Sequence, residues 1–160
     1  AAHGQPILFN QAGDPRPVAQ LQGLHILAIW TGKSASTSNF LVKLEEWKTE
    51  SGARFYSKMD ELAKISLSCT HNVEEQNISN LIENIIKFDS ALEAFSNTSQ
   101  LNFYSDNHLR MKTKSKKAGL AYKPSGAGGG DFGISFSDDA QRIKEFSERL
   151  SSLNIFNFIL

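Results

Sequence analysis

The residues best suited to do chemistry lie in one glycine-rich segment, residues 123–131 (KPSGAGGGD). Four of the chain's eleven glycines fall inside it, and glycine allows positive φ and a close approach of other groups to the backbone. Amides that no side chain shields form a concave site for anions, above all for phosphate oxygens. Since a hairpin that only reverses the chain needs about two residues, the segment predicts a phosphate-binding loop. The alternative is a flexible surface loop.

This loop offers backbone amides and one hydroxyl as ligands, from Ser125, Gly126, Ala127, Gly128 and Gly129. The alternative for the same residues is a tight connection between two strands. Of the charged residues beside them, Lys123 either offsets phosphate charge or is an exposed strand lysine. Asp131 is expected to stabilise the loop by accepting hydrogen bonds from amides. We predict no catalytic residue in this chain.

A second candidate group follows the apolar run 24–30, where small and hydroxyl residues break the strand pattern. Ser36 and Thr37 either line the pocket of an acceptor substrate or cap the next helix. No metal site is predicted, because the one cysteine and the four histidines lack the spacing of metal ligands. The basic run 110–117 is interpreted as a solvated helix surface.

The composition is that of an ordinary globular domain. The chain has 160 residues, 40% of them hydrophobic, and its 17 basic and 17 acidic side chains cancel. A net charge of zero argues against a general binder of nucleic acid or membrane surfaces, and no run is long enough to span a membrane. The single cysteine, Cys69, favours a reducing compartment, so we expect a cytoplasmic protein. The chain begins without methionine, which fits a processed chain or a piece of a longer one.

Apolar patterns predict strands on both sides of the glycine-rich segment and at 6–9, 24–30 and 155–160. Helices are predicted after a cap at Thr37 or Ser38, at 54–70, from Asn72 to Phe95 as one helix or two, at 106–118, and after a Ser137 cap. This order matches a split βαβ plan of ferredoxin-like type with helices inserted in its first half. We therefore predict one α+β domain over residues 1–160, with an antiparallel sheet.

Two of these segments resemble a known family. Residues 123–134 (KPSGAGGGDFGI) resemble the third, C-terminal motif of the GHMP small-molecule kinases. Residues 30–37 (WTGKSAST) look like the strand-end segment of bacterial-type phosphomevalonate kinases, which usually carry proline where this chain has Ser34 and cysteine where it has Phe132. The predicted helix at 106–118 is similar too, so the resemblance covers residues 24–136.

The resemblance implies the C-terminal domain of such a kinase without its N-terminal half. No run here resembles the family's loop that wraps the ATP phosphates, or the segment of its catalytic aspartate, and residues 1–20 would be the tail of that half. The reaction implied for the whole enzyme is transfer of the ATP γ-phosphoryl group to phosphomevalonate, with Mg²⁺ bridging phosphates. The absent half would bind most of the ATP and Mg²⁺, so we expect no useful activity from this chain alone.

Other interpretations stay open. The acceptor is phosphomevalonate, mevalonate or another small alcohol, or else the chain is a non-catalytic relic, or an interaction or anion-binding module of the same fold. RNA binding is disfavoured because the strands lack the stacked-aromatic signature of such domains. A missing half would leave an apolar face exposed, and exposed apolar patches favour association. We therefore also expect a dimer or a larger assembly.

Overall fold

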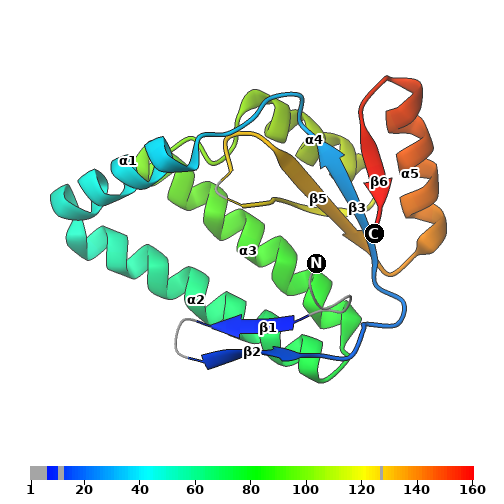
Figure 1. Cartoon of the computed structure of the whole chain (residues 1–160), viewed down its shortest axis with the longest axis horizontal. Helices are drawn as coiled ribbons and strands as arrows, with labels where there is room; N and C mark the ends of the chain where they lie inside the picture. Colours follow the sequence, from blue (N-terminus) through cyan, green and yellow to red (C-terminus); the bar gives the residue numbers. More distant parts are fainter. Residues whose placement is uncertain (1–6, 11–12, 127) are drawn as a thin grey trace.

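The computed structural model describes residues 7–10, 13–126 and 128–160. Its elements are β1 (Ile7–Asn10), β2 (Gly13–Pro17), β3 (His25–Trp30), α1 (Thr37–Glu50), α2 (Gly52–Glu74), α3 (Ile78–Ser99), α4 (Asp106–Lys117), β4 (Ala121–Pro124), β5 (Phe132–Ser137), α5 (Ala140–Ser152) and β6 (Asn157–Ile159). β1 and β2 form an antiparallel hairpin, and the other strands form one four-stranded sheet in the order β4-β5-β3-β6 (Figure 1).

The four-stranded sheet is antiparallel and has β3 in its interior, paired with β5 and β6. β3 is apolar because both of its faces are covered: Leu27 and Ile29 point to one face, Ala28 points to the other, and all three are buried. Helices connect β3 to β4 and β5 to β6, which is the split βαβ plan. The predicted ferredoxin-like α+β fold with inserted helices is confirmed.

Helices lie on both faces of this sheet (Figure 1). On one face, α4 and α5 build a core with the strands from Leu27, Ile29, Met111, Leu120, Tyr122, Ile143, Phe146 and Leu150. On the other face, α3 packs through Leu81 and Ile85 against Ala121 of β4. α1 and α2 extend this second layer, where Trp47 contacts Phe55 and Phe95. The inserted helices therefore have a core of their own.

The predicted start of α3 is wrong. The helical pattern of α2 continues to Glu74, so Asn72, predicted as a cap, is a buried residue inside that helix. Asn77 caps α3 instead, because its side chain accepts a hydrogen bond from the Asn80 amide at 3.1 Å. α3 then runs unbroken, so the region is one helix and not two.

The cap of α5 also differs from the prediction. Ser137 ends β5, and Asp139 caps the helix by accepting hydrogen bonds from two first-turn amides at 2.9 and 3.2 Å. The Ser137 hydroxyl oxygen accepts a hydrogen bond from the Asp139 amide at 3.0 Å. The serine therefore supports the capping residue and is not the cap itself.

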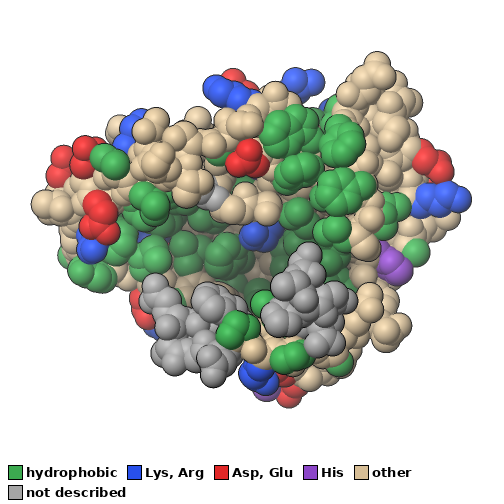
Figure 2. All heavy atoms as spheres, in the orientation of Figure 1, with side chains coloured by type: hydrophobic (Ala, Val, Ile, Leu, Met, Phe, Trp, Pro, Cys, Tyr) green, Lys and Arg blue, Asp and Glu red, His purple; other side chains and the backbone are tan. Residues whose placement is uncertain are grey.

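An exposed apolar face lies beside β6. The rings of Trp30 and Phe132 are 5.1 Å apart, and Phe158 lies 5.8 Å from Phe132 and 6.0 Å from Phe156. Phe156 is 63% exposed and Phe158 42%, and hydrophobic side chains gather on this part of the molecule in Figure 2. Self-association through this face stays a prediction. No helix in the described part of the chain is long and apolar enough to cross a membrane.

Candidate phosphate-binding site

The glycine-rich loop meets two other segments, and we call this meeting point the junction: residues 30–35 after β3, residues 101–108 around the start of α4, and residues 128–131 before β5. Thr31 donates two hydrogen bonds to the Asp131 carbonyl, from its amide at 2.9 Å and from its hydroxyl at 2.7 Å. The Asp131 amide donates to the Lys33 carbonyl at 2.7 Å. The junction thus continues the pairing of β3 with β5 beyond the end of the sheet.

The segment before α4 is bonded to both of the others. The Gly129 amide donates to the Phe103 carbonyl at 2.8 Å, and the Asn107 side-chain amide donates to the Thr31 carbonyl at 2.7 Å. α4 begins here because Ser105 caps it, accepting from the His108 amide at 3.4 Å. The shape of the glycine-rich loop is therefore set by contacts with distant parts of the chain.

We call residues 128–131 the pinned half of the loop. Neighbouring backbone atoms leave no room for a side chain at Gly128 or Gly130. A methyl group on Gly128 would come within 2.5 Å of the Phe103 carbonyl oxygen, and the residue has φ of +74°. A methyl group on Gly130 would come within 2.5 Å of the Lys33 carbonyl oxygen. These distances are too short for any side chain, so glycine lets three backbones pack against one another.

Ser125 and Gly126 form the open half of the loop, and Ala127, also predicted as a ligand, lies outside the described residues. The Ser125 amide donates to the Phe132 carbonyl at 2.9 Å and closes the hairpin. Gly126 has φ of +68°, and a methyl group there would meet no described atom within 4 Å. Among the described residues, no hydrogen-bond partner is found for the Ser125 hydroxyl or the Gly126 amide. The open half is thus where a ligand can approach.

The predicted acceptor residues Ser36 and Thr37 lie next to the junction, because the Ala35 amide donates to Asp131 Oδ1 at 3.3 Å. Ser36 is the N-cap residue of α1, but its side chain accepts no hydrogen bond from the helix, and Thr37 is the first helical residue. A side-chain cap at Thr37 or Ser38 is therefore wrong. The positive end of α1 lies beside the loop without a side-chain cap.

Lys123 is half-buried and is not an exposed strand lysine. Its ammonium group donates to the Pro124 carbonyl at 2.7 Å. Burial lowers the pKa of Lys123, which Asp89 and Cys69 partly oppose. The side chain lines a cavity of about 200 Å³ with Ser66, Cys69, Ile85 and Phe88. To reach an anion in the open half, the ammonium would have to leave its carbonyl partner.

Sequence analysis missed residues that hold the junction, above all His108. This histidine is completely buried, and hydrogen bonds of 2.8 Å join its Nδ1 to the Tyr122 hydroxyl and its Nε2 to the Gly130 carbonyl. A signal was present, because His108, Met111 and Ser115 have the spacing of one helix face, and all three are buried. Nothing in the sequence pointed to Tyr122 or Asn107.

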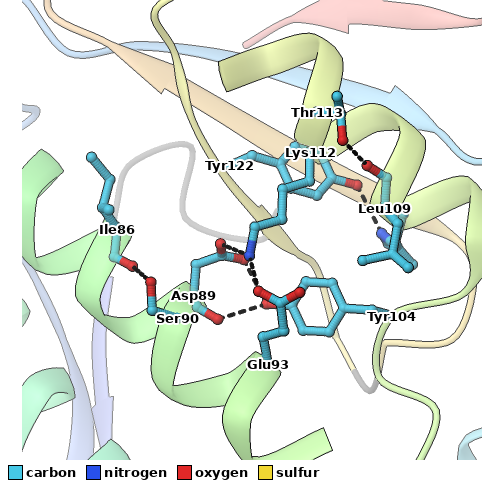
Figure 3. A network of polar contacts seen from close by, with 10 residues as sticks. Ile86, Asp89, Ser90, Glu93, Tyr104, Leu109, Lys112, Thr113 and Tyr122 are labelled. Atoms are coloured by element: carbon cyan, nitrogen blue, oxygen red, sulfur yellow. Dashed lines mark hydrogen bonds and ion pairs between the residues drawn. The ribbon is translucent and has the colours of Figure 1, made fainter. Parts of the chain in front are cut away.

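A partly buried ionic network joins α3 to α4 (Figure 3). Lys112 pairs with Asp89 at 2.5 Å and with Glu93 at 2.7 Å, and it lies 5.0 Å from the centre of the Tyr104 ring. The Tyr104 hydroxyl donates to Asp89 Oδ1 at 2.5 Å. Burial raises the pKa of Asp89, while the two carboxylates outweigh burial and raise the pKa of Lys112. Lys112 thus links α4 to α3 through ion pairs. The prediction that it belongs to a solvated helix surface is wrong.

Several groups at and beside the junction could donate hydrogen bonds to an anion. They are the Gly126 amide, the Ser125 hydroxyl and the first turn of α1. The Asp131 carboxylate accepts the Ala35 amide, as expected of an aspartate that stabilises a loop. The described residues contain no group of three or more His, Cys, Asp or Glu side chains that could hold a metal ion.

No family model matches the sequence, and no curated protein sequence matches it significantly. Solved structures do match. L. major mevalonate kinase in complex with R-mevalonate matches with a TM-score of 0.83 at 17% identity, over 100% of this chain and 50% of that chain. Streptococcus pneumoniae phosphomevalonate kinase in complex with phosphomevalonate and AMPPNP gives 0.68 at 24% identity, over 86% of this chain and 40% of that one.

A Lin0012 protein from Listeria innocua also matches, with a TM-score of 0.83 at 19% identity, over 91% of this chain and 41% of that chain. The chain therefore spans half or less of the length of these proteins. The fold of this chain is one that mevalonate and phosphomevalonate kinases contain in part of their length.

Proposed function

We propose that this chain is the substrate- and phosphate-binding part of an ATP-dependent small-molecule kinase, with phosphomevalonate or a similar small phosphorylated alcohol as acceptor. One observation carries the proposal: the glycine-rich loop contacts residues 33–35, which lead into the uncapped start of α1, through Gly130 and Asp131. Donors from two elements thereby face one place, as phosphate recognition requires. The likeness to kinases of this kind supports the same assignment.

In the proposed site the acceptor phosphate is bound by the loop and by the start of α1, through Ser125, Gly126, Ala127, Gly128, Ser36 and Thr37. Gly129 shapes the loop through its bond to Phe103, and Lys123 contributes positive charge once its ammonium group leaves the Pro124 carbonyl. In the complete enzyme, an oxygen of the bound acceptor phosphate would attack the γ-phosphorus of ATP; the new P–O bond would form as the bond to the β–γ bridging oxygen breaks and ADP leaves. The contribution of this chain is to position the attacking oxygen and to neutralise charge.

The described residues fit ATP and Mg²⁺ less well than they fit the acceptor phosphate. The described part of the chain offers no acidic cluster for Mg²⁺, and its glycine-rich loop is assigned to the acceptor. We therefore assign ATP and Mg²⁺ to a second half of the enzyme. A cytoplasmic location belongs to the same proposal.

The proposal predicts that phosphomevalonate binds this chain at the junction. In an NMR titration of the backbone amides, the signals of Gly126, Gly128 and Thr37 shift, and mevalonate, which lacks the phosphate, requires about tenfold more ligand. Ser125→Ala weakens binding by about threefold to tenfold because one donor is lost. Ser57→Ala, the same change on the exposed side of α2, leaves binding unaltered.

Shifts confined to other elements, or equal binding of mevalonate, would contradict the assignment of acceptor or site. We also expect no ADP release from ATP and phosphomevalonate with this chain alone. Turnover by this chain would place an ATP site among its own residues.

A second candidate is a non-catalytic interaction module, and the exposed aromatic face of Trp30, Phe132, Phe156 and Phe158 favours it. Such a module needs no anion site. The titration separates the two candidates, because phosphate-dependent shifts at the junction support only the first.

A further inference from the structure

The peptide group between Gly130 and Asp131 is held at both ends. Its carbonyl oxygen accepts a hydrogen bond from His108 Nε2 at 2.8 Å, and its N–H donates to the Lys33 carbonyl at 2.7 Å. Because a peptide group is planar and trans, the two bonds fix its orientation. Asp131 then adopts φ of +57°, a conformation that is uncommon for residues other than glycine. The two bonds thus hold an unusual turn in place.

The Gly130 carbonyl defines which ring nitrogen of His108 carries a hydrogen when the ring is neutral. A carbonyl oxygen can only accept, so Nε2 carries the hydrogen, and Nδ1 of the neutral ring accepts one from the Tyr122 hydroxyl at 2.8 Å. Gly133 leaves room for that hydroxyl, since a Cβ there would overlap the Tyr122 side chain. The hydrogen bonds therefore run in one direction, from Tyr122 through His108 to Gly130.

We propose that His108 is a positioning residue for anion binding: supported by Tyr122, its neutral ring orients the Gly130–Asp131 peptide and so fixes the loop in the shape that exposes the Gly126 amide. This inference rests on the proposed function of the loop. His108 is buried and does not touch the anion; it acts through Gly130.

The titratable groups around His108 come from several elements: Tyr104 before α4, Tyr122 on β4, Asp131 after the loop, Asp89 on α3, and Lys112, which pairs with Asp89. Burial lowers the pKa of His108 and outweighs the opposing effects of the Gly130 bond and the two carboxylates. Protonation would place a hydrogen on Nδ1, facing a hydroxyl that now donates to it. The neutral ring is therefore the form that fits this site.

The direction of the pH dependence follows from this. Above the unfolded value of about 6.5, His108 is neutral in both states, and its hydrogen bonds contribute fully to stability. Below it, the unfolded chain takes up the proton first, so the free energy of unfolding falls with decreasing pH. Sulfate is the suitable probe, because its charge stays constant here whereas the second pKa of a phosphate is about 6.

Matched substitutions test the proposal. His108→Gln keeps a donor near the position of Nε2, whereas His108→Asn keeps an acceptor for Tyr122 and loses the donor to Gly130. We expect His108→Asn to weaken sulfate binding by about tenfold and to speed hydrogen exchange of the Asp131 amide by a similar factor. His108→Gln should restore both to within about threefold of the unmodified chain. Equal behaviour of the two variants would overturn the proposal.

A second measurement does not depend on these variants folding. The ring nitrogen shifts of His108 in the unmodified chain should show a hydrogen on Nε2 alone, and Tyr122→Phe should keep it there, because the Gly130 carbonyl still accepts it. A hydrogen on Nδ1 in the unmodified chain would overturn the proposal. If the unmodified chain binds neither sulfate nor phosphomevalonate, the proposed function fails, and the exchange of the Asp131 amide still decides the role of His108. If binding occurs but His108→Asn leaves it unchanged, only the positioning role fails.

Discussion

The two halves of the glycine-rich loop contain glycine for different reasons. At Gly128 and Gly130 the neighbouring backbone occupies the place where a side chain would lie. At Gly126 no described atom occupies that place within 4 Å. The pinned half needs glycine so that the protein can pack, and the open half leaves space that a ligand can enter. A count of glycines alone does not distinguish these two needs.

The halves also differ in how their hydrogen-bonding groups are used. In the pinned half, the amides of Gly129 and Asp131 and the carbonyls of Gly130 and Asp131 all have partners within the chain. In the open half, the Ser125 hydroxyl and the Gly126 amide have none among the described residues. A ligand can therefore bind the open half without breaking bonds that hold the fold.

The largest expected effect is that of Gly128→Ala. The new methyl group would lie 2.5 Å from the Phe103 carbonyl oxygen, on a residue with φ of +74°. Backbone atoms cannot move aside as a flexible side chain can, so we expect a loss of about 4 kcal/mol in the free energy of unfolding. Urea denaturation measures it. A loss below about 1 kcal/mol would mean that the pinned half is not closely packed.

A smaller effect is expected from Lys112→Met, which tests the ion pairs between α3 and α4. The change leaves the Asp89 carboxylate, 7% exposed, without its cation, and we expect a loss of about 3 kcal/mol. Adding Asp89→Asn should recover part of the loss, because the buried charge is then gone. Lys116→Met on the exposed side of α4 is the matched control and should change stability little. Equal losses of stability for the two lysine variants would contradict a stabilising ion pair between Lys112 and Asp89.

Much of the fold could be predicted from the sequence, because periodicity is local information. The run 24–30 identified the central strand, and the stripe through Leu81 and Ile85 identified α3. The helix starts at Asn72 and Ser137 were wrong because several polar residues near each end could cap, and only the tertiary structure chooses among them. The second strand of the N-terminal hairpin, Gly13–Pro17, has no apolar alternation to predict it.

The site was less predictable because it depends on contacts between distant segments. The sequence marked the glycine-rich loop, but not that Phe103 and Lys33 accept its amides. His108 appeared only as a residue without metal-ligand spacing, and its role depends on Tyr122 and Gly130 being beside it. Lys112 seemed one of several surface lysines until α3 supplied its carboxylates.

The smallest effect on stability is expected from Gly126→Ala, the counterpart of the substitution at Gly128. Its φ of +68° makes alanine cost about 1 kcal/mol, but the methyl group enters open space. Gly52→Ala, where no atom lies within 4 Å and φ is not positive, controls for the general effect of replacing glycine. The two variants should differ little in urea denaturation.

Sulfate binding should separate them, because only the methyl group at Gly126 stands in the path of an anion approaching the loop amides. We expect a loss of about tenfold in affinity for Gly126→Ala and none for Gly52→Ala. A Gly126→Ala variant that unfolds as readily as Gly128→Ala would show that both halves of the loop are packed alike, and the open half would then be no binding site.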